Sequence, residues 1–278
     1  MAMPTDRIEG AAKRGVVEVI GGQRTPRQDL LAEEVPLAIH GNGEPLAVMM
    51  VSPCDLEDFG HGFALTELGI GGDDLLSVDV QALLEGIRLD LATRHPLPTR
   101  AATDQQRWLP GRSGCGICGN RHLEDVVRRP EAVGQGRRIT PAALDIALAA
   151  LEQRQPLNAA TGAIHAAAWA RADGTLVLVR EDVGRHNALD KLIGAMRRQR
   201  IDAGSGFVLV TSRASYEMVA KAARAGMPLL AAISAPTALA VDLAAGCGVT
   251  LVGFLRRGRH VVYSHPQRLD ARQASSDQ

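Results

Sequence analysis

The sequence has no uninterrupted apolar run approaching the ~20 residues that a membrane-spanning helix requires. Residues 1–22 also lack the apolar central region of a secretory signal. Lysine plus arginine equals aspartate plus glutamate at 31 each, so no global field attracts nucleic acid or an anionic membrane surface. We therefore expect a cytoplasmic protein with neither a nucleic-acid nor a membrane partner.

Cysteine is scarce, with four residues and no spacing typical of a disulfide framework. Such usage is typical of a reducing compartment, where thiols persist for chemistry rather than for cross-linking. With 278 residues and 46% hydrophobic composition, the chain can bury a sizeable core, and its length allows one large domain or two small ones.

Two of the cysteines, Cys115 and Cys118, lie in residues 111–119, where four of nine residues are glycine. This composition predicts a mobile loop, 109–122, because glycine supports neither helix nor strand. A structural zinc site needs about four ligands, and Cys54 and Cys247 are isolated in sequence. A thioredoxin-like pair should open a helix after a buried strand, which Pro110 and the glycines disfavour. A third interpretation is a nucleophilic sulfur on a loop that must reach two partners in turn.

The chain before this loop predicts a small α+β region over residues 31–108, preceded by a disordered tail over 1–30. Residues 34–40 and 44–51 are typical of strands flanking a hairpin turn at Asn42 and Gly43. A helix should follow, with Ser52 as its cap and Pro53 at its first position, ending at Gly69. Residues 77–92 have strand-like character that alanine and leucine leave ambiguous with helix.

Residues 139–266 predict an α/β domain, because strands alternate with helices of about ten residues. Thr140 should cap the first helix, with Pro141 at its first position. The strands expected next are 163–170, 175–180, 207–211, 229–234 and 250–256. Residues 267–278 should form a tail. Ligands of such sheets bind beyond the carboxyl ends of the strands, where helix N-termini face anions.

Three polar turns, 181–187, 212–215 and 234–237, occupy such strand ends and outline a crevice. Their side chains suit phosphate and base-edge hydrogen bonds; they are Arg185, His186, Ser212, Arg213, Ser215 and Thr237. A fourth turn packs three guanidinium groups into six residues, an arrangement suited to bidentate phosphate contacts. It consists of Phe254, Leu255, Arg256, Arg257, Gly258 and Arg259.

Long blocks of this sequence resemble the formate dehydrogenase accessory sulfurtransferase family (FdhD/NarQ). The similarity runs from about residue 33 to 264 and includes the cysteine loop and the turns above. Its main blocks are Glu34-Val35-Pro36, residues 55–59, residues 161–168, residues 180–191, residues 212–218, residues 232–237 and residues 254–259.

The resemblance implies a sulfur carrier and a sulfurtransferase. It would accept persulfide sulfur from a cysteine desulfurase on Cys115 and pass it to the molybdenum bis(molybdopterin guanine dinucleotide) cofactor that serves formate dehydrogenase. Cys118 would assist, and the residue 254–259 turn would bind the cofactor. The resemblance further implies a homodimer and a cytidine-deaminase-like, three-layer C-terminal domain beside a smaller N-terminal α+β domain.

Two alternatives of other classes stay open. One is a chaperone that holds the molybdenum cofactor without sulfur chemistry. The other is a zinc-dependent deaminase-like enzyme, because His122 and Glu124 have the spacing of the His-x-Glu part of the zinc deaminase signature. In that signature the histidine precedes the cysteine pair, whereas here it follows Cys118, so we assign no metal.

Overall fold

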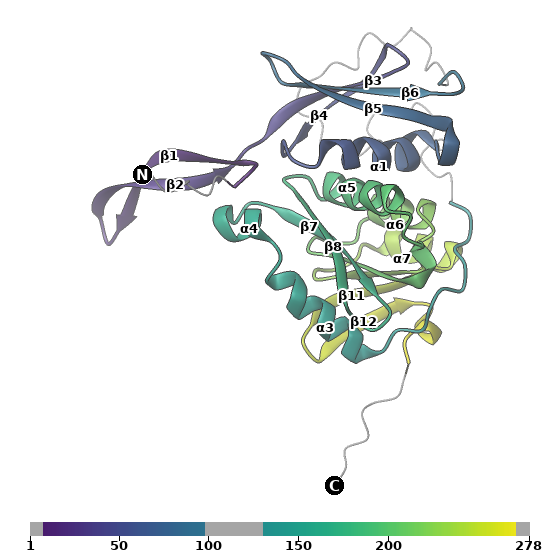
Figure 1. Ribbon diagram of the computed structural model, residues 1–278. Coiled ribbons are helices and arrows are strands. Elements are labelled where there is room, and N and C mark those ends of the chain that lie inside the picture. Colours follow the sequence, from purple (N-terminus) through teal and green to yellow (C-terminus); the bar gives the residue numbers. More distant parts are fainter. Residues whose placement is uncertain (1–7, 98–129, 271–278) are drawn as a thin grey trace.

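The computed structural model describes residues 8–97 and 130–270. Its described part contains a two-stranded hairpin, a four-stranded sheet and a six-stranded sheet (Figure 1). The arrangement from top to bottom in that view is small sheet, helix α1, helix α5, large sheet and helix α3. The chain is therefore a mixed α/β protein, as its sequence predicts. Among the described helices, none is long and apolar enough to cross a membrane.

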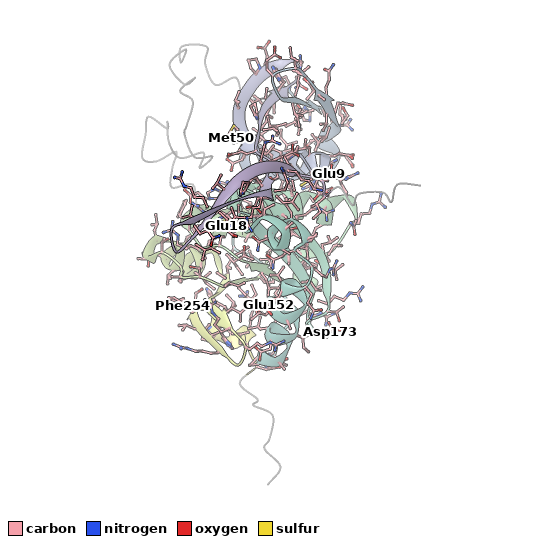
Figure 2. The ribbon with its side chains drawn as sticks, turned by 90° about the vertical axis from the view of Figure 1, so that its left-hand side faces the viewer. Glu9, Glu18, Met50, Glu152, Asp173 and Phe254 are labelled. Carbon is pink, nitrogen blue, oxygen red and sulfur yellow. The ribbon has the colours of Figure 1, made fainter. Side chains whose placement is uncertain are left out.

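The hairpin consists of β1 (Ala11–Ile20) and β2 (Gln23–Ala32), which pair antiparallel around Gly21 and Gly22. The prediction of a disordered tail over residues 1–30 is therefore wrong for this stretch. Both glycines have the positive φ that a tight turn needs. The base of the hairpin packs against Leu157 and Ile164, whereas its far end extends away from the body as an arm (Figure 1). Figure 2 views the molecule from the arm's side, with Glu18 on β1.

The small sheet has the order β4-β3-β6-β5. Its strands are β3 (Val35–Gly41), β4 (Glu44–Val51), β5 (Leu75–Ala82) and β6 (Ile87–Thr93), with a short 3-10 turn at Gly72–Asp74. The hairpin predicted at Asn42 and Gly43 is confirmed, and both residues have positive φ. The ambiguous stretch 77–92 is a pair of strands. Helix α1 (Leu56–Leu68) covers one face and ends at Gly69, as predicted.

The large sheet has the order β12-β11-β10-β9-β7-β8. Its strands are β7 (His165–Arg171), β8 (Leu176–Asp182), β9 (Gly206–Val210), β10 (Leu229–Ala232), β11 (Thr250–Arg256) and β12 (Arg259–Ser264). Strands β9, β10 and β11 run parallel, and β7 runs antiparallel to both β8 and β9. The carboxyl ends of β8, β9, β10 and β11 consequently meet at one edge, together with the start of β7.

Helices cover both faces of this sheet, which confirms the layer arrangement expected from the alternation. Helices α5 (Arg185–Arg198), α6 (Tyr216–Arg224) and α7 (Ala238–Cys247) pack on one face around Trp169. Helix α3 (Pro141–Glu152) packs on the other and is capped by Thr140, as predicted. Helix α4 (Pro156–Thr161) and a 3-10 turn at Ala203–Ser205 complete this half.

Helix α5 lies between α1 and the large sheet, so it is buried on nearly every side. The two helices cross in direct backbone contact at Gly62 and Gly194. A Cβ atom on Gly62 would lie 1.8 Å from the Asp190 carbonyl oxygen, and one on Gly194 would lie 1.8 Å from that of Asp58. Only glycine permits this approach, which joins the small sheet to the large one.

The end of the described chain is also packed, in contrast to the tail predicted over 267–278. A 3-10 turn spans Pro266–Arg268, and Leu269 forms a parallel bridge with Ile139. Arg268 is buried, and its guanidinium donates hydrogen bonds to the Gln135 and Gly134 carbonyl oxygens. Four backbone and side-chain acceptors around this guanidinium explain why a charged residue is tolerated there.

Candidate functional site

The three polar turns predicted to outline a crevice follow β8, β9 and β10, so the structure places all of them at the same edge of the large sheet. The turns after β9 and β10 are joined directly. The Ala214 amide donates to the Ala235 carbonyl at 3.2 Å, and the Thr237 amide donates to the Ala214 carbonyl at 3.1 Å. These backbone bonds make this part of the edge a defined surface rather than two independent loops.

Asp182, the last residue of β8, fixes the first turn from a fully buried position. One carboxylate oxygen accepts from the Gly184 amide at 2.7 Å and from the Asn187 side chain at 2.9 Å. The other accepts from the Ser52 amide at 3.0 Å and pairs with Lys191 Nζ at 2.7 Å. Asp182 therefore positions the start of α5 and ties it to the loop that follows β4.

Ser52 does not cap α1, contrary to the prediction. The helix begins at Leu56, and its N-cap is Asp55 in a left-handed conformation without a side-chain bond. The Ser52 hydroxyl instead accepts from the Val183 amide at 3.1 Å. The competing interaction is long-range, because Asp182 and Val183 lie some 130 residues further along the chain.

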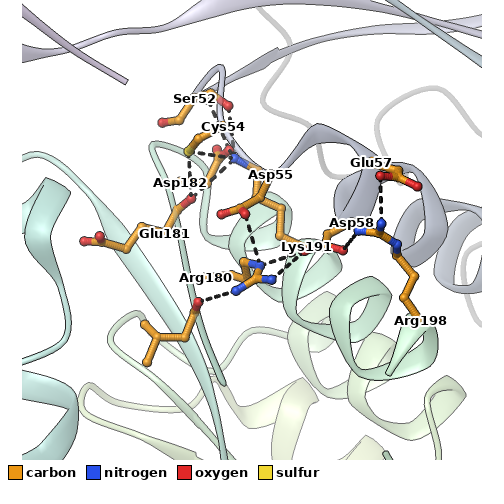
Figure 3. A network of polar contacts seen from close by, with 11 residues as sticks. Ser52, Cys54, Asp55, Glu57, Asp58, Arg180, Glu181, Asp182, Lys191 and Arg198 are labelled. Carbon is orange, nitrogen blue, oxygen red and sulfur yellow. Dashed lines mark hydrogen bonds and ion pairs between the residues drawn. The ribbon is translucent and has the colours of Figure 1, made fainter. Parts of the chain in front are cut away.

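Lys191 is fully buried and completes this network, which Figure 3 shows. Besides Asp182, its ammonium group donates to the Ser52 carbonyl at 3.0 Å and approaches Cys54 Sγ at 3.7 Å. Burial nevertheless raises the pKa of the Cys54 thiol, with the lysine acting in the opposite direction. Cys54 is thus mainly a protonated packing residue.

Arg185 and His186 form the first turn of α5 at this edge. His186 exposes only 7% of its surface, and its Nε2 atom has no hydrogen-bond partner among the described residues. The nearest carboxylate oxygen, Oε2 of Glu217, lies 3.7 Å away, too far for a hydrogen bond. The Nε atom of Arg185 is likewise buried without a partner in the described part. Two buried nitrogen atoms at this edge therefore have no hydrogen-bond partner among the described residues.

Glu217 supplies negative charge at the first turn of α6. Its pairing with His186 and the hydrogen bond from the Ser215 hydroxyl, 2.8 Å long, lower the pKa of Glu217 to about 2, against the effect of burial. The carboxylate is therefore ionised at neutral pH. Sequence reasoning assigned it no role, although its position two residues after Ser215, in the first turn of a helix, is a recognisable local signal.

His165, the first residue of β7, is a further member that sequence reasoning did not assign. It is partly buried and lies directly across from Asp182 in the β7–β8 register. Burial and the nearby Arg185 guanidinium lower the pKa of His165. No local feature of the sequence indicates this position, because the approach of His165 to Asp182 depends on how β7 and β8 pair.

Ser212 and Thr237, both predicted to bind a ligand, use their hydroxyls within the protein. Ser212 is buried and donates to the Arg213 carbonyl at 3.1 Å, whereas Thr237 caps α7 by accepting from the Ala240 amide at 3.3 Å. Arg213 is exposed between them. Of the residues predicted in these two turns, the Arg213 side chain therefore faces solvent most openly.

The turn of residues 254–259 joins β11 to β12 at the same edge. Leu255 is fully buried, and Arg256 donates to the Ile233 carbonyl at 2.6 Å. The Gly258 amide donates to the Asp145 carboxylate on α3 at 3.0 Å. Phe254 has a positive φ of 51° and is 44% exposed at the strand end, which Figure 2 labels.

Phe254, Arg256, Arg257 and Arg259 are exposed and can meet a ligand, although the Arg256 guanidinium also donates to the Ile233 carbonyl. Strand β11 lies three positions from β7 in the sheet. At about 4.8 Å a strand, this separates the 254–259 turn from His165 by about 14 Å along the edge, and Arg185, which follows β8, lies beyond it. An elongated anionic molecule could contact both ends, whereas a single phosphate group could not.

The two remaining site predictions, Cys115 and Cys118, fall in residues 98–129, outside the part that the structure describes. Within the described ranges, no group of three or more His, Cys, Asp or Glu side chains is placed to hold a metal ion.

Comparison with known proteins gives a consistent result. The sequence pattern of the FdhD/NarQ family matches residues 32–270. A protein of Xanthomonas euvesicatoria pv. vesicatoria named sulfur carrier protein FdhD is 55% identical over 97% of both chains. A protein of the same name from Cupriavidus necator is 51% identical over 87% of this chain and 84% of its own. The crystal structure of a formate dehydrogenase accessory protein from Desulfotalea psychrophila superposes with a TM-score of 0.74 at 26% identity, covering 93% of this chain and 99% of the other.

Proposed function

Because this chain belongs to the FdhD/NarQ family, we propose that it is a sulfur carrier that serves formate dehydrogenase. The observation that carries this proposal is the match over nearly the whole chain to relatives named as sulfur carriers. In the finer form, the chain accepts persulfide sulfur from a cysteine desulfurase on Cys115. It then delivers that sulfur to the molybdenum bis(molybdopterin guanine dinucleotide) cofactor, which is its client rather than a resident group.

The chemistry of the first step suits a cysteine in a reducing compartment. The Cys115 thiolate attacks the outer sulfur of the donor persulfide, the sulfur–sulfur bond of the donor breaks, and the donor cysteine leaves as a thiolate. No net oxidation occurs, so no further reagent is needed. The attacking group must be ionised, and an ordinary cysteine with a pKa of ~8.5 is ionised to only a few per cent at neutral pH.

The edge of the large sheet supports the second step. A guanine dinucleotide cofactor is long and carries several phosphates, and at two separated places the edge offers basic side chains that are exposed or have an unpartnered nitrogen atom. Arg185 and His186 lie at one end, and Arg257 and Arg259 lie at the other. Arginine matches phosphate oxygens in a bidentate geometry. We propose that the client spans this edge while Cys115 supplies sulfur and Cys118 assists it.

Intact-mass spectrometry without reductant tests the carrier role. The protein is incubated with a cysteine desulfurase and L-cysteine, and we expect a gain of one sulfur that dithiothreitol removes. Cys115→Ala should abolish the gain, whereas the matched control Cys54→Ala should retain it, because Cys54 packs beside Lys191. A folded wild type that gains no sulfur from an active desulfurase, yet binds the molybdenum cofactor, would indicate a cofactor-holding chaperone instead.

The family resemblance also leads us to propose a homodimer with a cytidine-deaminase-like large domain. Light scattering on the purified protein measures the molar mass directly, and a monomer at micromolar concentration would exclude a stable pair.

A further inference from the structure

Three groups that can carry positive charge meet where β7 begins and α5 begins. His165 lies at the start of β7, with its side chain on the same face as those of Ala167 and Trp169, the face covered by α5. Arg185 and His186 form the first turn of that helix. Extending the β7–β9 register by two residues places Ser212 opposite His165. The cluster is therefore assembled from three elements, not from one loop.

Two of the carboxylates near this cluster are already paired with lysines. Among the described residues, three carboxylates interact with it: Asp182, Glu67 and Glu217. Asp182 is paired with Lys191, whereas Glu67 shares Lys221 with the buried Asp190.

Glu217 is the one of these three carboxylates without a lysine partner among the described residues, and it lies 3.7 Å from His186 Nε2. The N-terminus of α5 adds partial positive charge at the same place, where helices usually carry acids. An arginine at the N-terminus of a helix is unfavourable for stability, because it opposes the helix dipole. A bound anion explains its position better than a stabilising role does.

Buried nitrogen atoms without hydrogen-bond partners also favour an anionic ligand at this place. Buried polar groups nearly always have hydrogen-bond partners, and exceptions call for a cause such as a ligand. Here the Nε2 atom of the nine-tenths buried His186 and the Nε atom of Arg185 both lack one among the described residues. The first-turn N–H groups of α5 have no partners within the helix and can also face an anion.

We propose that His165, Arg185 and His186 form a phosphate-binding site at the start of α5, and that His165 takes up a proton from solvent when phosphate binds. The inference deepens the proposed function, on which it rests for the identity of the natural ligand, a phosphate group of the client. It assigns His165 a binding role and makes client binding dependent on pH.

The direction of the pH dependence follows from the surroundings of His165. In the free protein, burial and Arg185 disfavour the imidazolium and lower the pKa of His165, with His186 contributing in the same sense and Asp182 opposing. A bound dianion reverses the sign of the local field, so the protonated form becomes favourable. Binding therefore consumes a proton, and affinity falls as the pH rises.

Calorimetric titration with inorganic sulfate tests this, because sulfate is a tetrahedral dianion that does not titrate between pH 5.5 and 7.5 in water. Ionic strength is held constant with sodium chloride, and each titration is run in two buffers of different ionisation enthalpy. We expect saturable binding with net proton uptake, weakening about tenfold across this range. Inorganic pyrophosphate serves as a second probe carrying the phosphate chemistry itself.

Substitutions test which residues bind the anion and which residue takes up the proton. His165→Asn and His165→Gln should remove the proton uptake and flatten the pH profile, and the second variant guards against a folding defect in the first. Arg185→Ala should abolish binding. Arg171→Ala is the matched control, because Arg171 is exposed at the opposite end of β7, and it should bind as the wild type does.

Three outcomes would overturn the inference: no saturable binding of either probe, unchanged binding by Arg185→Ala, or undiminished proton uptake by both folded His165 variants. Sulfur loading of Cys115, measured by mass on the same preparations, separates this result from the proposed function. Loss of anion binding with intact loading removes the phosphate site alone, whereas absent loading with intact anion binding removes the sulfur-carrier role alone.

Discussion

Replacing Lys191 by methionine tests how the candidate site is held in place. Lys191 and Asp182 are both fully buried and lie 2.7 Å apart. Lys191→Met keeps the length of the side chain but leaves the Asp182 carboxylate in the interior without its counter-ion. Removing one partner of a buried pair typically costs about 3–5 kcal/mol, a large part of the 5–15 kcal/mol that ordinary domains possess.

The structure places the expected cost toward the lower part of that range. Asp182 would still accept hydrogen bonds from the Ser52 and Gly184 amides and from the Asn187 side chain. Hydrogen bonds to a charged acceptor contribute about 1.5–3 kcal/mol each, so they offset part of the loss. We expect Lys191→Met to lower the free energy of unfolding by about 3 kcal/mol.

Urea unfolding followed by circular dichroism measures this free energy. The control is Arg198→Met, which removes ion pairs to Asp58 and Glu57 from a side chain that is 39% exposed. It should cost less than about 1 kcal/mol, because Asp58 keeps its pairing with Arg180. The reasoning would be refuted if Lys191→Met cost no more than Arg198→Met.

A double variant sharpens the assignment. Combining Lys191→Met with Asp182→Asn removes both charges, so the second change should cost less than it does in the wild type. We expect a coupling free energy of about 1–3 kcal/mol between the two positions. Additive costs would show that the pair is not the source of the loss.

Three further changes give independent checks. Gly62→Ala should cost at least 3 kcal/mol, since its Cβ would lie 1.8 Å from the Asp190 carbonyl oxygen, whereas Gly134→Ala, which meets no atom within 4 Å, should stay within about 0.5 kcal/mol by urea unfolding. Thr140→Ala should cost about 1 kcal/mol, because it removes the cap of α3; an unchanged midpoint would contradict this. The depressed pKa of Glu217, about 2 against an ordinary 4.5, means that its pairing stabilises the fold above pH 4.5 and is lost as the pH falls toward 2. Glu217→Gln should therefore destabilise the protein at pH 7, and a difference that did not shrink below pH 4.5 would argue against the pairing.

Local signals account for the parts of the fold that were predictable from sequence. The turn at Asn42 and Gly43 and the start of α3 at Thr140 and Pro141 depend on φ preferences and capping within a few residues. The alternation of strands and helices over the second half was sufficient to place the polar turns at one edge of a sheet. These features need no knowledge of distant contacts.

The wrong or missing predictions concern features that depend on contacts between residues far apart in the sequence. The β1–β2 arm has many polar side chains and a proline within β2, so its two strands lack a regular alternation and escaped prediction. Ser52 has the chemistry of a helix cap, but Asp182 and Val183 bind it instead. In the candidate site, His165 was missed for the same reason, because strand pairing alone brings it to Arg185.

The small sheet and its helix α1 stabilise the candidate site and do not form an independent unit. With its two carboxylate oxygens, Asp182 accepts from the Ser52 amide, which directly follows β4 of the small sheet, and from the Gly184 amide at the start of α5. Crowding cationic groups at the start of a helix is unfavourable by itself, so some other interaction must hold them there. The buried pair of Asp182 with Lys191 and the glycine crossing of α1 with α5 supply that interaction. A change at Ser52 should consequently disturb anion binding at the edge, even though Ser52 contacts the cluster only through Asp182 and Val183.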